Sequence, residues 1–480
     1  MRAIAIAVVL IVVAVAATAK ADMMLMPSFG GLYPPELLAD LDSVSRVTNL
    51  GTGEVLYANA SGHVNIEYGV AMQHDSRFMI GSNSKLYTTV SLYQLQEAGK
   101  LNLSSSVTDL LDASDFAKFG YPGQSTWCPQ LPGNSTCQTI TVHQLLAMSS
   151  GLYPALGCSV PPTQPGECNT DLYTASTSSI AAMVGSFINN PMIFVPGTRF
   201  VYTNPNFVLA SYLVEKFSGM TFAAYIKQHI SDVIGQSQTY FDLFDGEMGP
   251  MDAGRTTQYY KFYENSTAAG FPRLGYGRLR MELNTGAVSG TGGLVSTVPE
   301  EVRFWQVLFN KTGKGAPLLQ DPASVAAILH PWTFVNRMPI SSNVTVFNYY
   351  AQGIGVFCLD AACSAGPQFI VYTGQTLGST TSNALAYGEG CNMTMAQFWT
   401  SSVQATASES NYDRVRKAQN SRVLDFVHDW DGDVPMPRAL KWMLLDQHSP
   451  CKVSPDVPLS LVLGAFVDAE HQMFGGKKPL

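Results

Sequence analysis

The sequence predicts an α/β sandwich, in which helices cover a mainly antiparallel sheet and a helical subdomain is inserted in the middle of the chain. Residues 43–69 alternate short apolar runs with Gly and Asn, as the strands of a meander do. Residues 82–99 and 206–230 carry apolar side chains at helical spacing. Phe369 to Tyr372 is a short β-prone run followed by glycines, which is typical of a strand that passes close to another segment.

The length and composition are those of a globular protein. The 480 residues are 46% hydrophobic and 13% charged, so a sizeable core can form and no long tract is predicted to be disordered. The predicted organisation is a signal peptide at 1–21, a main domain at 22–400 (sheet part about 40–100 and 285–400, helical part about 100–285), and a C-terminal extension at 401–480 packed on that domain.

The first 21 residues have the pattern of a secretory signal peptide. A single Arg precedes an apolar run from Ala3 to Ala17, and small residues then offer cleavage sites at Ala17-Thr18-Ala19 or Ala19-Lys20-Ala21. An uncleaved anchor is the alternative, but the run is shorter than the roughly 20 residues that span a bilayer. We therefore expect a secreted protein, or one in the lumen of the secretory pathway, with no membrane span after signal removal.

The first helix is expected from Ser82 to Gly99. Leu86, Val90 and Tyr93 recur on one face, and Gly99 supplies a C-terminal stop. Other faces of this helix are also apolar, so we expect it to be central and buried.

Two capping boxes mark the starts of later helices. Thr141 with Gln144 opens a helix predicted to run to Gly151, and Thr297 with Glu300 opens another that has an apolar stripe. In each box the hydroxyl caps the helix while the side chain three residues later reaches back.

The remaining segments give weaker signals. Residues 153–191 are rich in Pro, Gly, Ser and Cys, which predicts a long loop or small subdomain held by a disulfide. Helical patterns resume at 206–219 and 221–230, the signal between about 235 and 285 is poor, and the tail beyond about 400 mixes amphipathic helix with loops.

All eight cysteines follow the predicted signal peptide, and an even count in this context indicates disulfides in an oxidising compartment. A zinc site is the competing interpretation, but no CxxC occurs and the histidines do not cluster near the cysteines. Neighbours in the sequence suggest pairs, although eight cysteines allow 105 connectivities. The candidate pairs are Cys128 with Cys137, Cys158 with Cys168, Cys358 with Cys363, and the remaining Cys391 with Cys451.

Glycosylation signals agree with a secreted chain. Asn-x-Ser/Thr sequons occur at Asn59, Asn102, Asn134, Asn265, Asn310, Asn343 and Asn392.

The composition and motif content exclude several classes of function. The net charge of −8, without a cluster of Lys and Arg, argues against nucleic acid or an anionic membrane as a partner. No HExxH, P-loop, GxGxxG after a strand or GxSxG is present, and the acidic stretch at 428–433 lacks the Gly and Glu of a calcium loop. We expect no metal and no cofactor, and the sequence makes no prediction of oligomeric state.

Ser82 stands three residues before Lys85, which brings hydroxyl and ammonium onto one face of a helix start. In a chain of this length about one Ser-x-x-Lys match is expected by chance. A second match runs from Ser449 to Lys452, but Pro450 and Cys451 suit neither a helix interior nor a free nucleophile. Whether the first match is catalytic therefore depends on which other motifs accompany it in the sequence.

The first match and four further motifs occur in a defined order along the chain. They are Gly81-Ser82-Asn83-Ser84-Lys85, Thr141 to Gly151, Tyr202-Thr203-Asn204, Gly292-Gly293-Leu294-Val295-Ser296-Thr297, and Tyr372-Thr373-Gly374. This order resembles the serine β-lactamase and penicillin-binding-protein family, closest to its class C-like branch of β-lactamases, esterases and D-amino-acid peptidases, over residues of about 40 to 400. The resemblance implies a β-lactamase/transpeptidase-like fold and the catalytic boxes Ser-x-x-Lys, Tyr-x-Asn and Lys-Thr-Gly.

The resemblance also implies a role for each box. Ser82 would be the nucleophile, helped by the positive end of its helix. Lys85, shut away from water, would have a lowered pKa and accept or relay the serine proton. Tyr202 would be a second base, and Asn204 would hydrogen-bond Lys85 and the substrate. Which of Lys85 and Tyr202 takes the proton first is left open.

The third box would be a strand edge that binds substrate through Tyr372, Thr373 and Gly374. The backbone N–H groups of Gln375 and Ser82 would form the oxyanion hole.

Other copies of these motifs are rejected. Tyr57-Ala58-Asn59, Tyr263-Glu264-Asn265 and Lys311-Thr312-Gly313 all overlap a sequon, which favours an exposed loop over a catalytic site. His143 is given no catalytic role.

Two departures from the family pattern matter. Met148 stands where the family commonly has His, which we interpret as packing. Tyr372 stands where a Lys or His opens the third box, so the cation that helps to bind a substrate carboxylate is missing.

These features predict a secreted serine hydrolase that acts through an acyl-enzyme on a small-molecule or peptide ester or amide. A true β-lactamase or D-Ala-D-Ala carboxypeptidase, and a catalytically silent binding protein of the same fold, stay open as alternatives.

Overall fold

A computed structural model provides the structure of the chain. It describes residues 42–65, 68–154, 179–241, 256, 258–262, 277–281, 289–309, 318–339, 345–364, 366–367, 369–376, 379–386, 394–400 and 402–405. The predicted signal peptide and residues 406–480 of the predicted C-terminal extension lie outside the described residues. Among the described helices, none has the length and apolar character needed to cross a bilayer.

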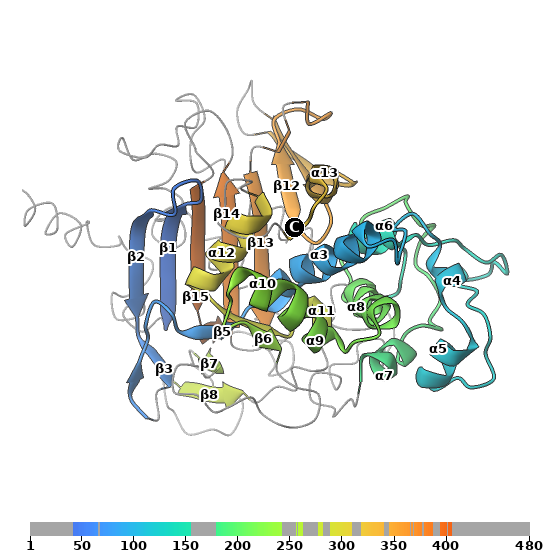
Figure 1. The fold of residues 1–480 in the computed structure, drawn as a ribbon, viewed down its shortest axis with the longest axis horizontal. Coiled ribbons are helices and arrows are strands. Elements are labelled where there is room, and N and C mark those ends of the chain that lie inside the picture. Colours follow the sequence, from blue (N-terminus) through green and yellow to red (C-terminus); the bar gives the residue numbers. More distant parts are fainter. Residues whose placement is uncertain are drawn as a thin grey trace, which may run out of the picture.

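An eight-stranded antiparallel sheet forms the main layer of the fold (Figure 1). Its strands, in spatial order, are β10 (Thr333–Pro339), β11 (Thr345–Tyr350), β12 (Gly355–Cys358), β13 (Phe369–Thr376), β14 (Ser379–Ala386), β15 (Thr394–Thr400), β1 (Ser43–Asn49) and β2 (Val55–Ser61). The N-terminal hairpin joins the late strands where β1 pairs with β15, from Ser43 opposite Thr400 to Asn49 opposite Thr394. The predicted sheet, built from both ends of the domain, is confirmed.

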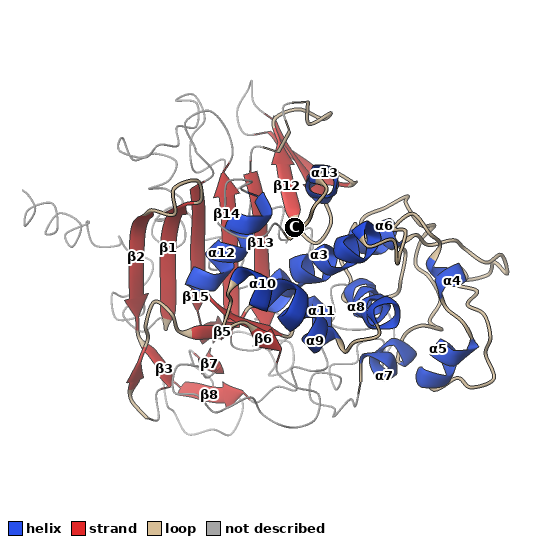
Figure 2. Cartoon of the chain, viewed as in Figure 1, coloured by secondary structure: helices blue, strands red, loops and turns tan. Residues whose placement is uncertain are grey.

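Helices cover this sheet and also form a separate group beside it. Figure 2 shows the strands of the large sheet on one side of the molecule and most of the helices on the other. The helices are α3 (Ser84–Glu97), α4 (Val107–Leu110), α5 (Ala113–Lys118), α6 (Val142–Leu146), α7 (Ile180–Gly185), α8 (Pro205–Ser218), α9 (Phe222–Ile226), the π-helix η3 (Lys227–Ser231), α10 (Asp232–Ile234), α11 (Ser289–Gly292), α12 (Val298–Phe309) and α13 (Pro322–Leu329).

The α3 helix is the centre of the core, as its apolar faces predict. Tyr87 and Tyr93 on it are fully buried. The Tyr87 ring stacks on Phe304 of α12 with 3.8 Å between ring centroids. Helix α12 in turn packs on β1 and β15, so α3 is linked to the large sheet through an apolar layer.

The capping box of Thr141 and Gln144 is confirmed. The Gln144 N–H donates to Thr141 Oγ1 at 3.2 Å, and the Thr141 N–H donates to Gln144 Oε1 at 2.9 Å. The helix ends at Leu146, before the predicted Gly151, because Met148 takes a left-handed backbone with φ of 53° that no α-helix can continue.

The described residues also form three small sheets that were not predicted as separate units, although residues 63–65 belong to the predicted meander at 43–69. They are β5 (Arg77–Met79) with β9 (Leu294–Thr297) and β6 (Tyr240–Phe241), then β16 (Ser402–Ala405) with β7 (Gln258–Phe262) and β8 (Gly277–Met281), and finally β3 (His63–Asn65) with β4 (Val70–Ala71). Strands of two to five residues leave almost no periodic signal in a sequence. The first of these sheets matters for function, because β5 leads directly into the Ser82 turn.

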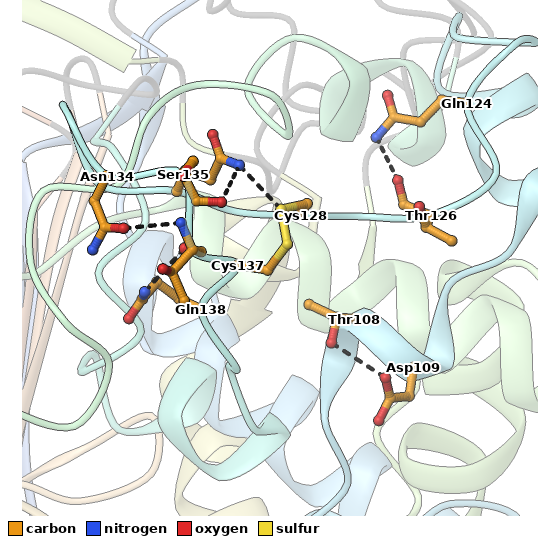
Figure 3. Close-up of a disulfide and its surroundings, with 11 residues drawn as sticks. Thr108, Asp109, Gln124, Thr126, Cys128, Asn134, Ser135, Cys137 and Gln138 are labelled. Atoms are coloured by element: carbon orange, nitrogen blue, oxygen red, sulfur yellow. Dashed lines mark hydrogen bonds between the residues drawn. A yellow bond between two sulfur atoms is a disulfide. The ribbon is translucent and has the colours of Figure 1, made fainter.

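Two of the four candidate disulfides join described residues, and both are present: Cys128–Cys137 and Cys358–Cys363. Figure 3 shows the first of them, Cys128–Cys137. Within the loop that it closes, the Asn134 side chain accepts a hydrogen bond from the Thr136 N–H at 2.9 Å. Candidates Cys158, Cys168, Cys391 and Cys451 lie outside the described residues.

Sequons Asn59, Asn102 and Asn134 are exposed. Those at Asn265, Asn310, Asn343 and Asn392 lie outside the described residues. Glycosylation of the exposed sequons stays a prediction.

Candidate active site

The Ser82 turn is a one-turn 3₁₀ helix, η1 (Gly81–Asn83), that leads into α3. Gly81 has a φ of 54°, in the left-handed region that glycine adopts at no steric cost. The neighbouring hydroxyl of Ser84 is fully buried, donates to the Gly81 carbonyl at 2.7 Å and accepts from the Leu294 N–H at 3.1 Å. Ser84 therefore holds the turn on β9, and Ser82 carries the half-buried hydroxyl.

The Ser82 hydroxyl is contacted from two other positions in the sequence. Lys85 Nζ lies 2.9 Å from Ser82 Oγ, and the Tyr202 hydroxyl lies 2.7 Å from the same atom. Tyr202 is 120 residues away in the chain and reaches Ser82 from the segment before α8. An amine and a phenol on one serine oxygen give that oxygen two groups able to take or return its proton.

Lys85 is fully buried, and burial lowers its pKa well below the usual value for lysine. Besides Ser82, its Nζ donates to Asn204 Oδ1 at 3.0 Å and to the Thr291 carbonyl at 2.8 Å. The aromatic face of Tyr202 lies 4.9 Å from the nitrogen, measured to the ring centroid. The amine is thus held by neutral acceptors, and burial favours its uncharged form.

Thr291, on the short helix α11, is a site residue that the sequence analysis did not identify. Besides its carbonyl contact with Lys85, its hydroxyl donates to Asn204 Oδ1 at 2.7 Å. Asn204 therefore receives two hydrogen bonds on one oxygen. The only available signal was the adjacent Gly292-Gly293 pair, which marks a close backbone approach without naming the residue that makes it.

Met148 replaces the expected histidine and contacts the segment that carries Tyr202. Its sulfur lies 3.4 Å from the Thr203 N–H and 3.2 Å from Asn206 Nδ2, and its carbonyl accepts from the Val201 N–H at 3.1 Å. Met148 therefore packs in the core, as expected, and also accepts hydrogen bonds that position the backbone on both sides of Tyr202.

The third box lies on β13, beside the Ser82 turn. A Cβ added to Gly374 would stand 1.8 Å from the Ile80 carbonyl oxygen, so this strand and the residue before Gly81 touch backbone to backbone. Pairing of β13 with β12 ends at Val371 opposite Gly355, whereas pairing with β14 continues to Thr376. The Thr381 hydroxyl of β14 donates to the same Ile80 carbonyl at 2.8 Å, so the residue that leads into the Ser82 turn contacts both β13 and β14.

Tyr372 and Thr373 of this box are both buried, with 3% and 2% of their surface exposed. The Tyr372 hydroxyl lies 3.4 Å from the Tyr202 hydroxyl and 2.5 Å from that of Tyr350 on β11. Gln375 pairs with Thr380 in the β13–β14 ladder. The oxyanion hole of Gln375 and Ser82 stays a prediction.

A buried polar network anchors the turn to the large sheet and was not predicted. Asn83 Nδ2 donates to Thr381 Oγ1 at 2.7 Å, and Asn383 Nδ2 donates to Asn83 Oδ1 at 3.0 Å. The Trp399 indole N–H donates to Asn383 Oδ1 at 3.0 Å. Because buried amides are costly to leave unpaired, this network fixes the position of the residue that follows Ser82.

Of the rejected motifs, the copy at 57–59 lies among the described residues, on a strand far from the Ser82 turn in the order of the sheet. Tyr57 and Asn59 lie on β2, at the opposite edge of the sheet order from β10, and Asn59 is exposed. The other rejected copies at 263–265, 311–313 and 449–452 lie outside the described residues.

His143 is half-buried, with its Nδ1 2.7 Å from Gln352 Nε2 and its ring stacked on Trp332. Within the described ranges, no group of three or more His, Cys, Asp or Glu side chains is arranged to hold a metal ion.

Replacing Gly374 by alanine is expected to destabilise the protein, because neither the Ile80 carbonyl nor Thr381 Oγ1, at 2.7 Å from the added Cβ, can move without breaking the strand contact. We expect a loss of about 3 kcal/mol in the free energy of unfolding, measured by urea denaturation. The matched control is Gly123→Ala, since a Cβ there meets nothing within 4 Å and φ is not positive. Equal stability of the two variants would contradict the backbone contact.

Comparison with known proteins assigns one family to most of the chain. The family model described as Beta-lactamase matches residues 44–418. A penicillin binding protein from Bacillus halodurans has a similar structure, with a TM-score of 0.54 at 20% identity over 78% of this chain and 94% of that one. The D-amino acid amidase from Ochrobactrum anthropi SV3, complexed with D-phenylalanine, gives 0.53 at 19% identity over 81% and 97%. At these identities the likeness shows a common fold.

Sequence similarity to curated proteins is more limited in extent. Protein flp of Staphylococcus aureus strain MW2 is 23% identical over 190 residues, which are 39% of this chain and 33% of that protein. The chain thus spans about a third of the length of the curated relatives it matches.

Proposed function

The chain belongs to the beta-lactamase family, and on this basis we propose that it is a serine hydrolase that forms an acyl-enzyme on Ser82 with an ester or amide substrate. The observation that carries the proposal is the convergence of Lys85 Nζ and the Tyr202 hydroxyl on Ser82 Oγ, at 2.9 and 2.7 Å. Neither contact is needed to fold an ordinary helix start, whereas each places a group able to take and return the serine proton on its oxygen.

In the proposed reaction, Ser82 Oγ forms a bond to the acyl carbon while its proton passes to Lys85 or Tyr202. The negative charge that develops on the acyl oxygen would be stabilised by the N–H groups of Ser82 and Gln375, worth about 3 to 4 kcal/mol per donor in comparable enzymes. The bond to the leaving group then breaks, and the leaving oxygen or nitrogen takes the proton. Water hydrolyses the acyl-enzyme by the same route and restores Ser82.

Burial of Lys85 supports its part in this scheme. A lysine that stays charged at neutral pH would only donate to Ser82, whereas the lowered pKa makes the neutral amine accessible as a proton acceptor. Asn204 and the Thr291 carbonyl hold the nitrogen in place in either state, because both accept hydrogen bonds from it.

The proposed substrates lack a carboxylate beside the bond that breaks. Tyr372 takes the place of a cation, and its hydroxyl is buried against two other phenols instead of facing solvent. A neutral, buried hydroxyl cannot form the charge-assisted hydrogen bond that a cation would form with the carboxylate of β-lactams and of peptides ending in D-alanine. The D-amino acid amidase with the same fold is a relative whose name indicates an amide substrate.

We also propose that the protein is secreted. The pattern of the first 21 residues supports this, and so do the two disulfides, since disulfides persist in oxidising compartments.

Comparing kcat/KM for p-nitrophenyl butyrate and for nitrocefin tests the substrate class. We expect the uncharged ester to be turned over roughly 100-fold more efficiently, because a charge-assisted hydrogen bond is worth about 2 to 3 kcal/mol. Ser82→Ala must remove both activities. Turnover of nitrocefin equal to that of the ester would instead indicate a true β-lactamase, and no turnover of either would favour a binding protein.

A further inference from the structure

Three buried tyrosines from three separate segments form a chain of hydroxyls that ends on Ser82. Tyr350 on β11 lies 2.5 Å from Tyr372 on β13, Tyr372 lies 3.4 Å from Tyr202, and Tyr202 lies 2.7 Å from Ser82 Oγ. Tyr350 is fully buried, and Tyr202 and Tyr372 are 5% and 3% exposed. Tyr350 belongs to none of the catalytic boxes, and its ring meets those of Tyr202 and Tyr372 edge-on.

The number of protons available fixes the direction of the hydrogen bonds between these three hydroxyls. A phenol has one proton to donate. When Tyr202 donates to Ser82 Oγ, the proton between Tyr202 and Tyr372 must come from Tyr372, and the proton between Tyr372 and Tyr350 must come from Tyr350. All three hydroxyls then point the same way, toward Ser82.

The same direction is favoured more strongly once Tyr202 has lost its proton. The phenolate oxygen then accepts from Tyr372, and hydrogen bonds to a charged acceptor are shorter and stronger than neutral ones. The contact of 3.4 Å between Tyr202 and Tyr372 leaves room for that shortening, since catalytic hydrogen bonds are often long in the free enzyme. Burial raises the pKa of Tyr350 and of Tyr372 well above the usual tyrosine value, so both remain protonated donors.

We propose that Tyr350 and Tyr372 are positioning residues for Tyr202, which hold its phenol on Ser82 and stabilise it as a phenolate through a one-way chain of donated hydrogen bonds. This inference rests on the proposed function. It deepens that function by assigning the Tyr372 hydroxyl to Tyr202 instead of to the substrate. Tyr350 thereby acquires a role that no motif in the sequence gives it.

The titratable groups that face the chain come from three elements. Lys85 of α3 lies over the Tyr202 ring, while Tyr350 of β11 and Tyr372 of β13 act on Tyr202 and on each other. Lys85 and Tyr202 both contact Ser82. The pH dependence of acylation therefore reports the titration of the pair and not of either residue alone. Donors to Tyr202 favour its charged form, so removing them raises the pH at which this pair can accept a proton.

Tyr350→Phe tests the proposal, with Tyr349→Phe as its matched control. Tyr349 lies next to Tyr350 on the same strand, and its hydroxyl donates to the Ala361 carbonyl at 2.6 Å, away from Ser82. Each variant loses one hydroxyl and one hydrogen bond. The burst of p-nitrophenol that accompanies acylation by p-nitrophenyl butyrate is recorded from pH 5 to 10, and the melting temperature shows that both variants fold.

For Tyr350→Phe we expect the rise of the acylation rate with pH to move upward by about one unit, with a roughly tenfold slower burst at neutral pH. Tyr372→Phe should move it in the same direction and further, and Tyr349→Phe should leave it unchanged. A Tyr350→Phe profile that superimposes on the wild type, or that falls equally at every pH as lost packing would cause, overturns the inference and leaves the hydrolase proposal standing. A wild-type protein that releases no p-nitrophenol from the ester at any pH overturns both.

Discussion

Replacing Ser82 by alanine is expected to lower ester turnover by at least about a thousandfold while the protein remains folded. Lys85 Nζ and the Tyr202 hydroxyl both contact Ser82 Oγ. Without that oxygen no acyl-enzyme can form, and the two bases have no proton to move. The loss would appear in kcat, because the groups that bind the substrate remain.

The matched control for this variant is Ser91→Ala on α3, the helix that follows the Ser82 turn. Ser91 is fully buried, and its hydroxyl donates to the Tyr87 carbonyl within α3. It therefore tests what loss of a buried serine hydroxyl from α3 does to the fold alone. Retention of activity in Ser82→Ala, or its loss in Ser91→Ala at unchanged stability, would count against Ser82 as the nucleophile.

Replacing Lys85 by methionine is expected to reduce the acylation rate by about 10² to 10⁴, the usual contribution of a general base. Methionine fills the buried volume of the lysine stem but offers no nitrogen to Ser82, Asn204 or the Thr291 carbonyl. Burst kinetics with p-nitrophenyl butyrate would separate this loss in acylation from any change in deacylation.

Lys216→Met is the control for loss of a lysine charge. Lys216 on α8 forms ion pairs with Asp112 and Asp115 and does not contact Ser82. We expect this variant to change stability and to keep the wild-type acylation rate. A Lys85→Met enzyme within tenfold of the wild-type rate would transfer the role of first base to Tyr202.

Much of the fold and the order of the site could be predicted because the relevant signals are local. Ser82 and Lys85 are three residues apart, and Gly99, with its φ of 68°, ends the helix that they begin. The capping box at Thr141 and the disulfide Cys128–Cys137 are likewise set by residues close in sequence. Short-range patterns such as these can be read without knowledge of the tertiary fold.

The contacts that position the site could not be predicted, because they join distant residues without a motif. Asn83 and Asn383 are 300 residues apart, and Tyr350 reaches Tyr372 only because β11, β12 and β13 are neighbours in the sheet. Lys85 donates to the backbone carbonyl of Thr291, and every residue type has such a carbonyl, so the sequence gives no signal for this contact. The sequence thus indicates the groups that we propose as catalytic, whereas contacts between distant segments hold them in position.

The central claim is that the hydroxyl of Ser82 is the nucleophile. The measurement that tests it most directly is peptide mapping by mass spectrometry after treatment of the full chain with a fluorophosphonate probe. The account predicts a single adduct on Ser82, none on the neighbouring Ser84, and no adduct in Ser82→Ala. An adduct on Ser84, or one that persists in Ser82→Ala, would contradict it.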